Sequence, residues 1–183
     1  DQITAAFGGF NLIEFNSSQD FTVQNIIGQK KIDILNKCSI LLFTGIRRLS
    51  EKLEKDKMKK IHTGLVDKHL HSINDITEEA LTEFTKREMN LKNIGKLMNL
   101  YWEEKKKLAG GVSNDTVDSI CKIAMKNGAY GSKLLGSGGG GFVYILCSPK
   151  NKLKIEKKLS KYQIVNFAFE NSGSTIIYNQ TVK

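Results

Sequence analysis

The densest run of glycine in the chain lies at residues 136–141, and its composition suits the binding of an anion. Five of these six residues are glycine, and Ser137 is the only interruption. Glycine lets the backbone approach a ligand closely and adopt positive φ without steric cost. Such a loop can turn several N–H groups toward one anion, as phosphate-binding loops do. The candidate phosphate-binding or substrate-binding residues are Gly136, Ser137, Gly138, Gly139, Gly140 and Gly141.

Two other interpretations of this run are weaker. Gly136, Gly138 and Gly141 match G-x-G-x-x-G literally, but the dinucleotide-binding motif needs a strand before the glycines and a helix after them. Here a helical pattern ends near 127–128 and a strand begins at Phe142. A flexible linker usually has polar flanks, whereas this run lies between two leucines and an apolar strand. A structured anion-binding loop is therefore the favoured interpretation.

Other polar side chains are candidates for the same site. Thr44, Gly45 and Arg47 follow the end of a predicted strand, where binding sites often form. Arg47 suits a sugar phosphate because its guanidinium can donate paired charge-assisted hydrogen bonds. Lys133 could also reach an anion, and the Ser137 hydroxyl could add a donor. The alternatives are that Arg47 and Lys133 are ordinary surface cations.

The residues that commonly bind metals give no predicted metal site. His69 and His71 are two residues apart, so they face different ways on a helix. Cys38, Cys121 and Cys147 are far apart and form no C-x-x-C, which favours reduced thiols over a zinc or redox motif.

The composition is that of a globular protein with an affinity for anions. Hydrophobic residues make up 40% and charged residues 26%, and the net charge is +9. The basic residues at 47–60 and 150–161 are mixed with glutamates, which is typical of a solvated helix face. A phosphorylated small molecule is thus preferred to nucleic acid as a partner. No run has transmembrane length or a signal-peptide pattern, so no membrane partner is expected.

Hydrophobic periodicity predicts an α+β fold. Apolar stripes with three- and four-residue steps predict three amphipathic helices between residues 66 and 125, the third capped by Asn114 or Ser113 and ended by Asn127 and Gly128. A lysine-rich helix is expected at 151–161, and 49–62 is either a helix or a loop. The predicted strands are a hairpin over 5–27 and segments 38–43, 141–147, 163–170 and 174–179. This order suggests a split β-α-β sheet with helices on one face.

Four segments, at 1–15, 41–48, 102–114 and 127–147, resemble the GHMP kinase superfamily in family order. Within it, the likeness is greatest to kinases of D-glycero-D-manno-heptose 7-phosphate. The resemblance implies a ferredoxin-like C-terminal domain at 31–183, with an antiparallel sheet and helices on one face. It also implies that residues 1–30 are a β-hairpin remnant of the N-terminal kinase domain. The chain would then be the C-terminal part of a longer cytoplasmic enzyme of unknown oligomeric state.

The same resemblance assigns chemical roles. Asp1 matches the active-site aspartate of the superfamily, as general base or electrostatic orienter. ATP and a sugar phosphate would be the substrates, with Mg²⁺ held by residues upstream of this chain, so the chain alone is expected to be inactive. The acceptor could instead be another sugar or a small alcohol. A non-catalytic regulatory domain that binds an anion or a sugar phosphate is the alternative from a different class.

Overall fold

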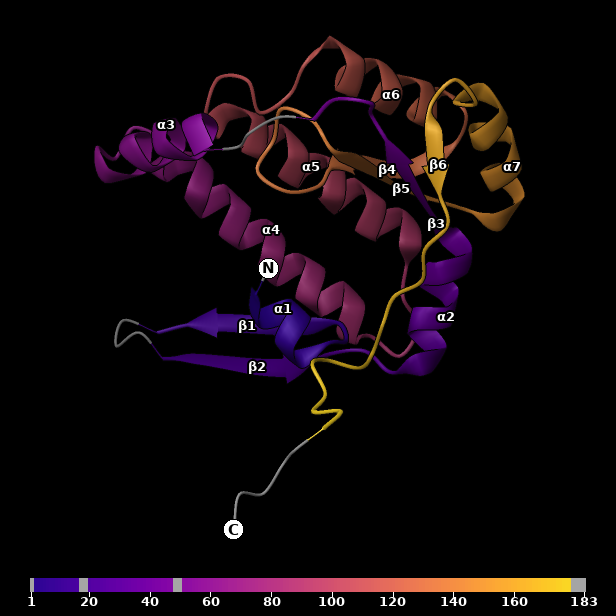
Figure 1. Ribbon diagram of the computed structural model, residues 1–183, viewed down its shortest axis with the longest axis horizontal. Helices are drawn as coiled ribbons and strands as arrows, with labels where there is room; N and C mark the ends of the chain where they lie inside the picture. Colours follow the sequence, from indigo (N-terminus) through magenta and orange to yellow (C-terminus); the bar gives the residue numbers. More distant parts are fainter. Residues whose placement is uncertain (1, 17–19, 48–50, 179–183) are drawn as a thin grey trace.

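The centre of the molecule is a four-stranded antiparallel sheet in the order β4-β5-β3-β6 (Figure 1). The computed structural model describes residues 2–16, 20–47 and 51–178, except for the side chains of residues 51 and 52. The strands are β3 (Ser39–Phe43), β4 (Ala129–Leu134), β5 (Phe142–Cys147) and β6 (Gln163–Val165). The central pair places Leu41 opposite Tyr144 and Phe43 opposite Phe142. The predicted α+β class with an antiparallel sheet is confirmed.

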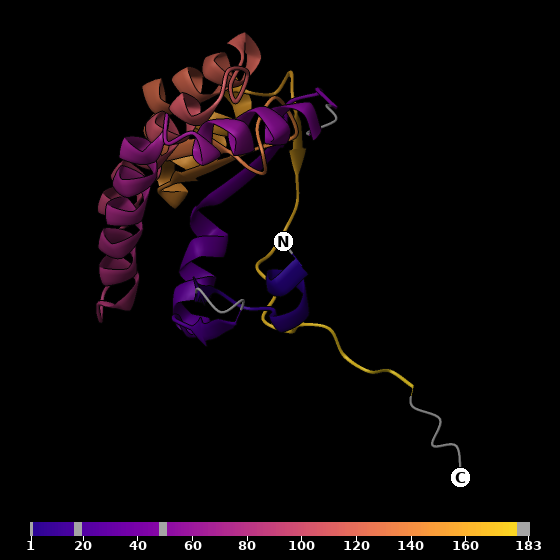
Figure 2. The same cartoon turned by 90° about the vertical axis from the view of Figure 1, so that its left-hand side faces the viewer.

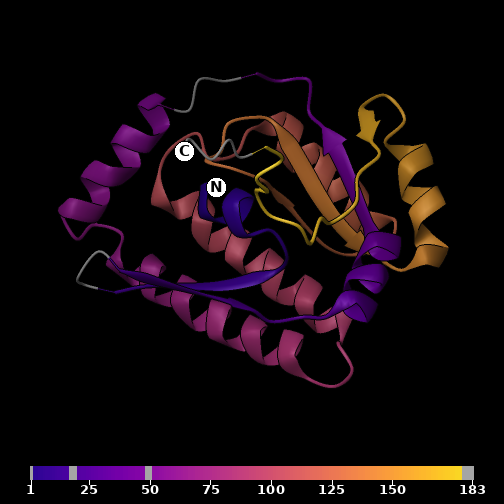
Figure 3. The same ribbon diagram turned by 60° about the horizontal axis from the view of Figure 1, so that its bottom comes forward.

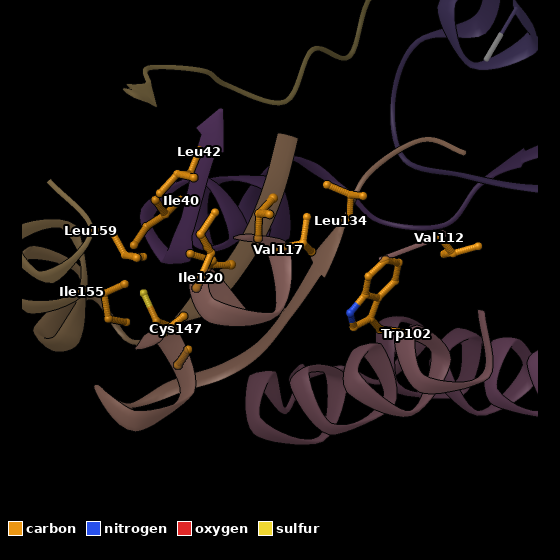
Figure 4. Close-up of a cluster of buried hydrophobic side chains, with 14 of the residues drawn as sticks. Ile40, Leu42, Trp102, Val112, Val117, Ile120, Leu134, Cys147, Ile155 and Leu159 are labelled. Atoms are coloured by element: carbon orange, nitrogen blue, oxygen red, sulfur yellow. The ribbon is translucent and has the colours of Figure 1, made fainter. Parts of the chain in front are cut away.

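Helices α6 (Asp115–Lys126) and α7 (Pro149–Lys158) cover one face of the sheet. Successive strand residues point to opposite faces, so Val143 and Ile145 face these helices while Tyr144 and Leu146 face away. Figure 4 shows the resulting core, in which side chains of both helices meet those of β3 and β5. Ile120 and Ile145 are completely buried there. This face carries the main hydrophobic core.

Helices α4 (Asp67–Thr85) and α5 (Leu91–Leu108) form an antiparallel pair beside the sheet (Figure 3). Asn90 caps α5 by accepting from the backbone N–H groups of Lys92 and Asn93. His69 of α4 and Glu104 of α5 are linked through Nδ1 and Oε2 at 2.7 Å. Helix α5 lies along β4 and covers this edge of the sheet.

The N-terminal residues form a second, two-stranded sheet apart from the first (Figures 1 and 2). Strands β1 (Asn11–Phe15) and β2 (Phe21–Asn25) pair antiparallel, which confirms the predicted hairpin. Residues Gln2–Phe7 form helix α1, so the strand predicted from residue 5 was wrong in its first part. Gly8 and Gly9, with φ of 63° and 78°, end the helix and turn the chain into β1. The backbone N–H of Ser174 donates to the carbonyl of Ala6, which ties the C-terminal segment to α1.

Some elements depart from the sequence-based expectations, and one alternative that the sequence left open is resolved. Helix α2 (Gln29–Cys38) and strand β4 were not predicted, and α3 (Glu51–His62) shows that the lysine-rich segment is helical. The strand predicted at 163–170 keeps ladder pairing only in β6, and residues 174–178 form no strand. Helix α7 begins two residues before its predicted start because Ser148 caps it and Pro149 occupies the first turn.

The domain boundary expected at residue 30 falls in the first turn of α2 and stays a prediction. None of the helices in the described ranges is long and apolar enough to cross a membrane. The three cysteines are free thiols, as expected.

Candidate anion-binding site

The glycine run closes the hairpin between β4 and β5. The backbone N–H of Leu135 donates to the carbonyl of Phe142 at 2.8 Å, and residues 136–141 form the loop beyond this pair. A strand therefore does precede the glycines, contrary to the sequence-based expectation of a helix at that place. No helix follows them, because β5 starts at Phe142, and the dinucleotide-binding motif stays excluded.

Hydrogen bonds hold the loop on two sides. On one side, the N–H of Gly139 donates to the carbonyl of Val112 at 2.9 Å, and the Asn114 side chain donates to the carbonyl of Gly139 at 3.0 Å. On the other side, the N–H of Gly141 donates to the carbonyl of Ile46 at 3.0 Å. The loop is thus structured, as favoured from the sequence over a flexible linker.

Thr44 holds the end of the loop through its side-chain hydroxyl. Its hydroxyl donates to the carbonyl of Gly141 at 2.9 Å and accepts from the N–H of Ile46 at 3.2 Å. Only 5% of Thr44 is exposed, so its hydroxyl is directed at the loop backbone. Gly45 turns the chain after Thr44 with φ of 79°, which is a left-handed conformation that favours glycine.

The loop carries four backbone donors that have no acceptor within residues 2–16, 20–47 and 51–178. These are the N–H groups of Gly136, Ser137, Gly138 and Gly140. The N–H groups of Gly139 and Gly141 donate to other carbonyls, so they cannot serve an anion at the same time. The loop therefore offers some of its N–H groups to a ligand and uses the rest to hold its shape.

Two shallow hollows flank the loop, and Arg47 lines both. The first has a volume of about 420 Å³ and includes Ser137, Gly138 and Gly140 in its wall. The second has a volume of about 500 Å³ and lies against Gly139 and the beginning of α6. Arg47 is exposed, so its guanidinium is accessible to a ligand beside the loop.

Lys133 lies away from these hollows. Its Nζ is 4.1 Å from the centre of the Tyr101 ring, in the wall of an apolar cavity under the sheet. Burial, and secondarily the charge of Lys105, lowers the pKa of Lys133 to about 8. The structure therefore brings Arg47 together with the loop but leaves Lys133 outside the group.

Lys105 contacts the glycine loop, and the sequence alone did not identify it. Its Nζ donates to the carbonyl of Gly136 at 2.6 Å and so fixes the start of the loop to α5. Burial is also the main cause that lowers the pKa of Lys105. Three consecutive lysines, 105–107, end this helix, and only the packing of α5 decides which of them reaches the loop. Asn114 was predicted as a helix cap, and its second role at Gly139 became visible only in the structure.

Asp1 lies outside the described residues, so its assigned role is not tested. Within the described part of the chain, no cluster of three or more His, Cys, Asp or Glu side chains could hold a metal ion. The arrangement that is present can bind an anion through backbone N–H groups, the Ser137 hydroxyl and Arg47.

Comparisons with known proteins point to one family of enzymes. The family model described as GHMP kinases C terminal matches residues 78–164. D-glycero-alpha-D-manno-heptose 7-phosphate kinase of Campylobacter jejuni is 32% identical over 179 residues, which cover 94% of this chain and 51% of that protein.

Solved structures share the fold. A mevalonate kinase has a TM-score of 0.68 at 27% identity, over 91% of this chain and 49% of its own. A D-glycero-D-manno-heptose 1-phosphate kinase from Bacteriodes thetaiotaomicron has a TM-score of 0.57 at 25% identity, over 98% of this chain and 49% of its own. The chain spans about half the length of these relatives. It belongs to the GHMP kinase superfamily and carries the C-terminal domain of that superfamily.

Proposed function

We propose that the protein containing this chain transfers the γ-phosphate of ATP to a hydroxyl of D-glycero-D-manno-heptose 7-phosphate. The similarity to the Campylobacter jejuni kinase over 94% of the chain supports this acceptor. The reaction would serve the cytoplasmic synthesis of nucleotide-activated heptose for surface polysaccharide.

The glycine loop is the observation that carries this proposal. Phosphoryl transfer depends mainly on positioning and on stabilising negative charge that spreads over the phosphoryl oxygens. Donors that are fixed before the reaction give this stabilisation without reorganisation. Ser137, Gly138 and Gly140 line the hollow together with Arg47, and their N–H groups have no acceptor among the described residues. The loop that carries them is held by hydrogen bonds to Val112, Ile46 and Thr44. A phosphate group in this hollow would meet several donors and one cation.

This chain has donors for a phosphate of the nucleotide, but no ligands for the metal are assigned to it. A phosphate of ATP or of the sugar matches the donors of the loop. Mg²⁺ bound to ATP would neutralise charge on the transferring phosphates. No ligand for Mg²⁺ is assigned to this chain, and we place those ligands in sequence upstream of it. Asp1 would accept or orient the proton of the sugar hydroxyl.

The first test is an ADP-release assay on the full-length protein with D-glycero-D-manno-heptose 7-phosphate. We expect turnover with this acceptor and none from the purified 183-residue chain, because half of the length of the related kinases lies outside it. Sugar-phosphate binding by the full-length protein without ADP release would instead favour the non-catalytic regulatory domain. Turnover by the 183-residue chain would refute the placement of essential groups upstream.

The substitution Ser137→Val tests the loop itself. Valine removes the hydroxyl and adds a branched side chain inside the hollow, so we expect kcat/KM to fall by about tenfold or more. Ser137 is preferred to Gly139 as a target because φ of 79° at Gly139 would strain any added side chain. Ser119→Val, on the exposed face of α6, is the matched control. Equal kinetics in the two variants would remove the loop from the mechanism.

A further inference from the structure

An apolar cavity of about 530 Å³ lies on the face of the sheet that α6 and α7 leave uncovered. Leu41 and Tyr144 of the sheet line it, together with residues of α4 and α5. Phe167 and Phe169, which follow β6, line it from the C-terminal segment. Pockets for small molecules typically have volumes of about 300–1,000 Å³, so this cavity has the size of a ligand site.

The part of the cavity wall that the described residues form contains a cation and no acidic side chain. Lys133 lies in this wall, and none of the described aspartates or glutamates does. In the described part of the chain, Lys133 donates no hydrogen bond and forms no ion pair, and its only recorded polar contact is with the Tyr101 ring. Lys105 also approaches this ring, at 5.7 Å from its centre, but its ammonium donates to Gly136. Lys133 is therefore a cation in the cavity wall whose ammonium has no acceptor among the described residues.

The burial of the Lys133 ammonium without an acceptor indicates that a ligand of this cavity would be negatively charged. An ammonium group has three donors, and a partly buried polar group without an acceptor loses hydration that nothing replaces. The depressed pKa of Lys133, about 8, has burial as its main cause. Two hydroxyls of the wall are already hydrogen-bonded: that of Tyr144 to Ser39 at 2.6 Å, and that of Thr77 to the carbonyl of Ile73 at 2.8 Å. An anion beside Lys133 would restore the lost interactions.

We propose that this cavity binds a small amphipathic anion as a second ligand site, distinct from the hollows of the glycine loop. The hydrocarbon or aromatic body contacts Tyr144, Phe167 and Phe169, and the anionic head accepts hydrogen bonds from Lys133 Nζ. A bare phosphate would leave the apolar lining without contacts, and a neutral hydrocarbon would leave Lys133 without an acceptor. Only a ligand with both parts satisfies the whole wall.

The cavity adjoins the strand end that leads into the glycine loop. Leu135 lines both the cavity and the hollow beside Ser137, and the next residue is Gly136, which Lys105 holds. A ligand in the cavity would contact the strand that leads directly into the loop. The binding proposal nevertheless rests on the cavity alone and holds whether or not the proposed kinase activity is correct.

The test is a fluorescence titration of the full-length protein with 1-anilinonaphthalene-8-sulfonate, an aromatic anion, at pH 7. We expect saturable binding with one probe per chain. Dodecanoate and dodecyl phosphate should displace the probe, and their relative strengths identify the preferred head group. Dodecanol should fail to displace it at the same concentration. Absence of saturable binding, or displacement by dodecanol as strong as by dodecanoate, would overturn the proposal.

Two variants locate the binding. Lys133→Met should raise the Kd of the probe by about tenfold or more, as expected for loss of a charge-assisted hydrogen bond. Ala80→Phe adds a ring inside the cavity and should abolish binding, and Ala80→Leu gives the same test if the larger ring prevents folding. Lys122→Met, at an exposed position on α6, is the control for charge. If Lys133→Met binds as tightly as Lys122→Met, the assignment of the head group is wrong.

Discussion

The substitution Gly95→Ala should destabilise the protein by about 3 kcal/mol or more, because it overlaps backbone atoms that cannot move aside. Helix α5 and strand β4 approach so closely that a Cβ on Gly95 would collide with the backbone of Tyr130. The contact is mutual, since a Cβ on Gly131 would collide with the carbonyl group of Gly95. Alanine normally improves a helix by about 1 kcal/mol over glycine, so a large loss would isolate the steric effect.

Urea denaturation measures this prediction, with Gly110→Ala as the matched control. A Cβ on Gly110 meets no atom within 4 Å, so this variant should lie within about 1 kcal/mol of the parent. Similar denaturation midpoints for Gly95→Ala and Gly110→Ala would show that α5 and β4 do not pack in this register.

The contact between α5 and β4 also determines the geometry of the candidate site. The Asn99 side chain donates to the carbonyl of Tyr130 at 3.3 Å and accepts from the N–H of Ser132 at 2.9 Å, so α5 satisfies the edge of β4. Six residues further along α5, Lys105 reaches Gly136. Small residues at the crossing let the helix lie close enough for both contacts. A variant that pushes α5 away should therefore disturb the loop as well as the core.

Replacing Lys133 by methionine should raise the free energy of unfolding by about 2 kcal/mol at pH 7. A pKa of about 8 lies well below the ordinary value of 10.5, and this difference corresponds to a penalty of about 3 kcal/mol for the protonated form in the folded state. Loss of the contact with the Tyr101 ring offsets about 1 kcal/mol of the gain. Methionine has a similar length and suits the apolar wall.

The advantage of the methionine variant should shrink as the pH rises. Below pH 8 lysine is protonated in both states, and the full penalty opposes folding. Between pH 8 and 10.5 the folded state releases the proton while the unfolded state retains it, so the parent gains stability with pH. The variant lacks this gain. Deprotonation of other groups, such as Cys147 and Tyr144, occurs in both proteins and cancels in the difference.

Urea midpoints of the parent and Lys133→Met at pH 7, 8.5 and 10 measure this difference. Lys122→Met, whose side chain is exposed, should match the parent at all three values. A difference between the parent and Lys133→Met that stays constant across the range would mean that Lys133 keeps an ordinary pKa. Its place in the cavity wall would then be wrong.

Local patterns in the sequence determined the elements whose formation depends on neighbours along the chain. The apolar stripes of α4, α5 and α6 each supply one apolar face. Helix α6 begins after its N-cap Asn114 and stops just before Asn127 and Gly128, as predicted. The glycine loop and the strand after it were also recognisable, because five glycines and a run of apolar residues leave few other structures. The hairpin β1–β2 lies within the predicted range 5–27.

Only the tertiary structure decided the rest. Strand β4 contains glycine, serine and lysine, and its pattern does not indicate a strand; it exists because β5 pairs with one edge and Asn99 of α5 satisfies the other. Segment 166–170 reads as a strand but pairs with no strand in the described part of the chain. Its backbone is hydrogen-bonded to Asn36 and Gly9 instead, and Phe167 and Phe169 line the cavity. Lys105 and Lys133 could not be told apart from the sequence, where both are lysines near an apolar stripe. Helix α5 and strand β4 pack closely at Gly95 and Gly131, and in this packing Lys105 contacts the glycine loop while Lys133 lies in the cavity wall. The position of a long side chain depends on the surface against which its backbone packs.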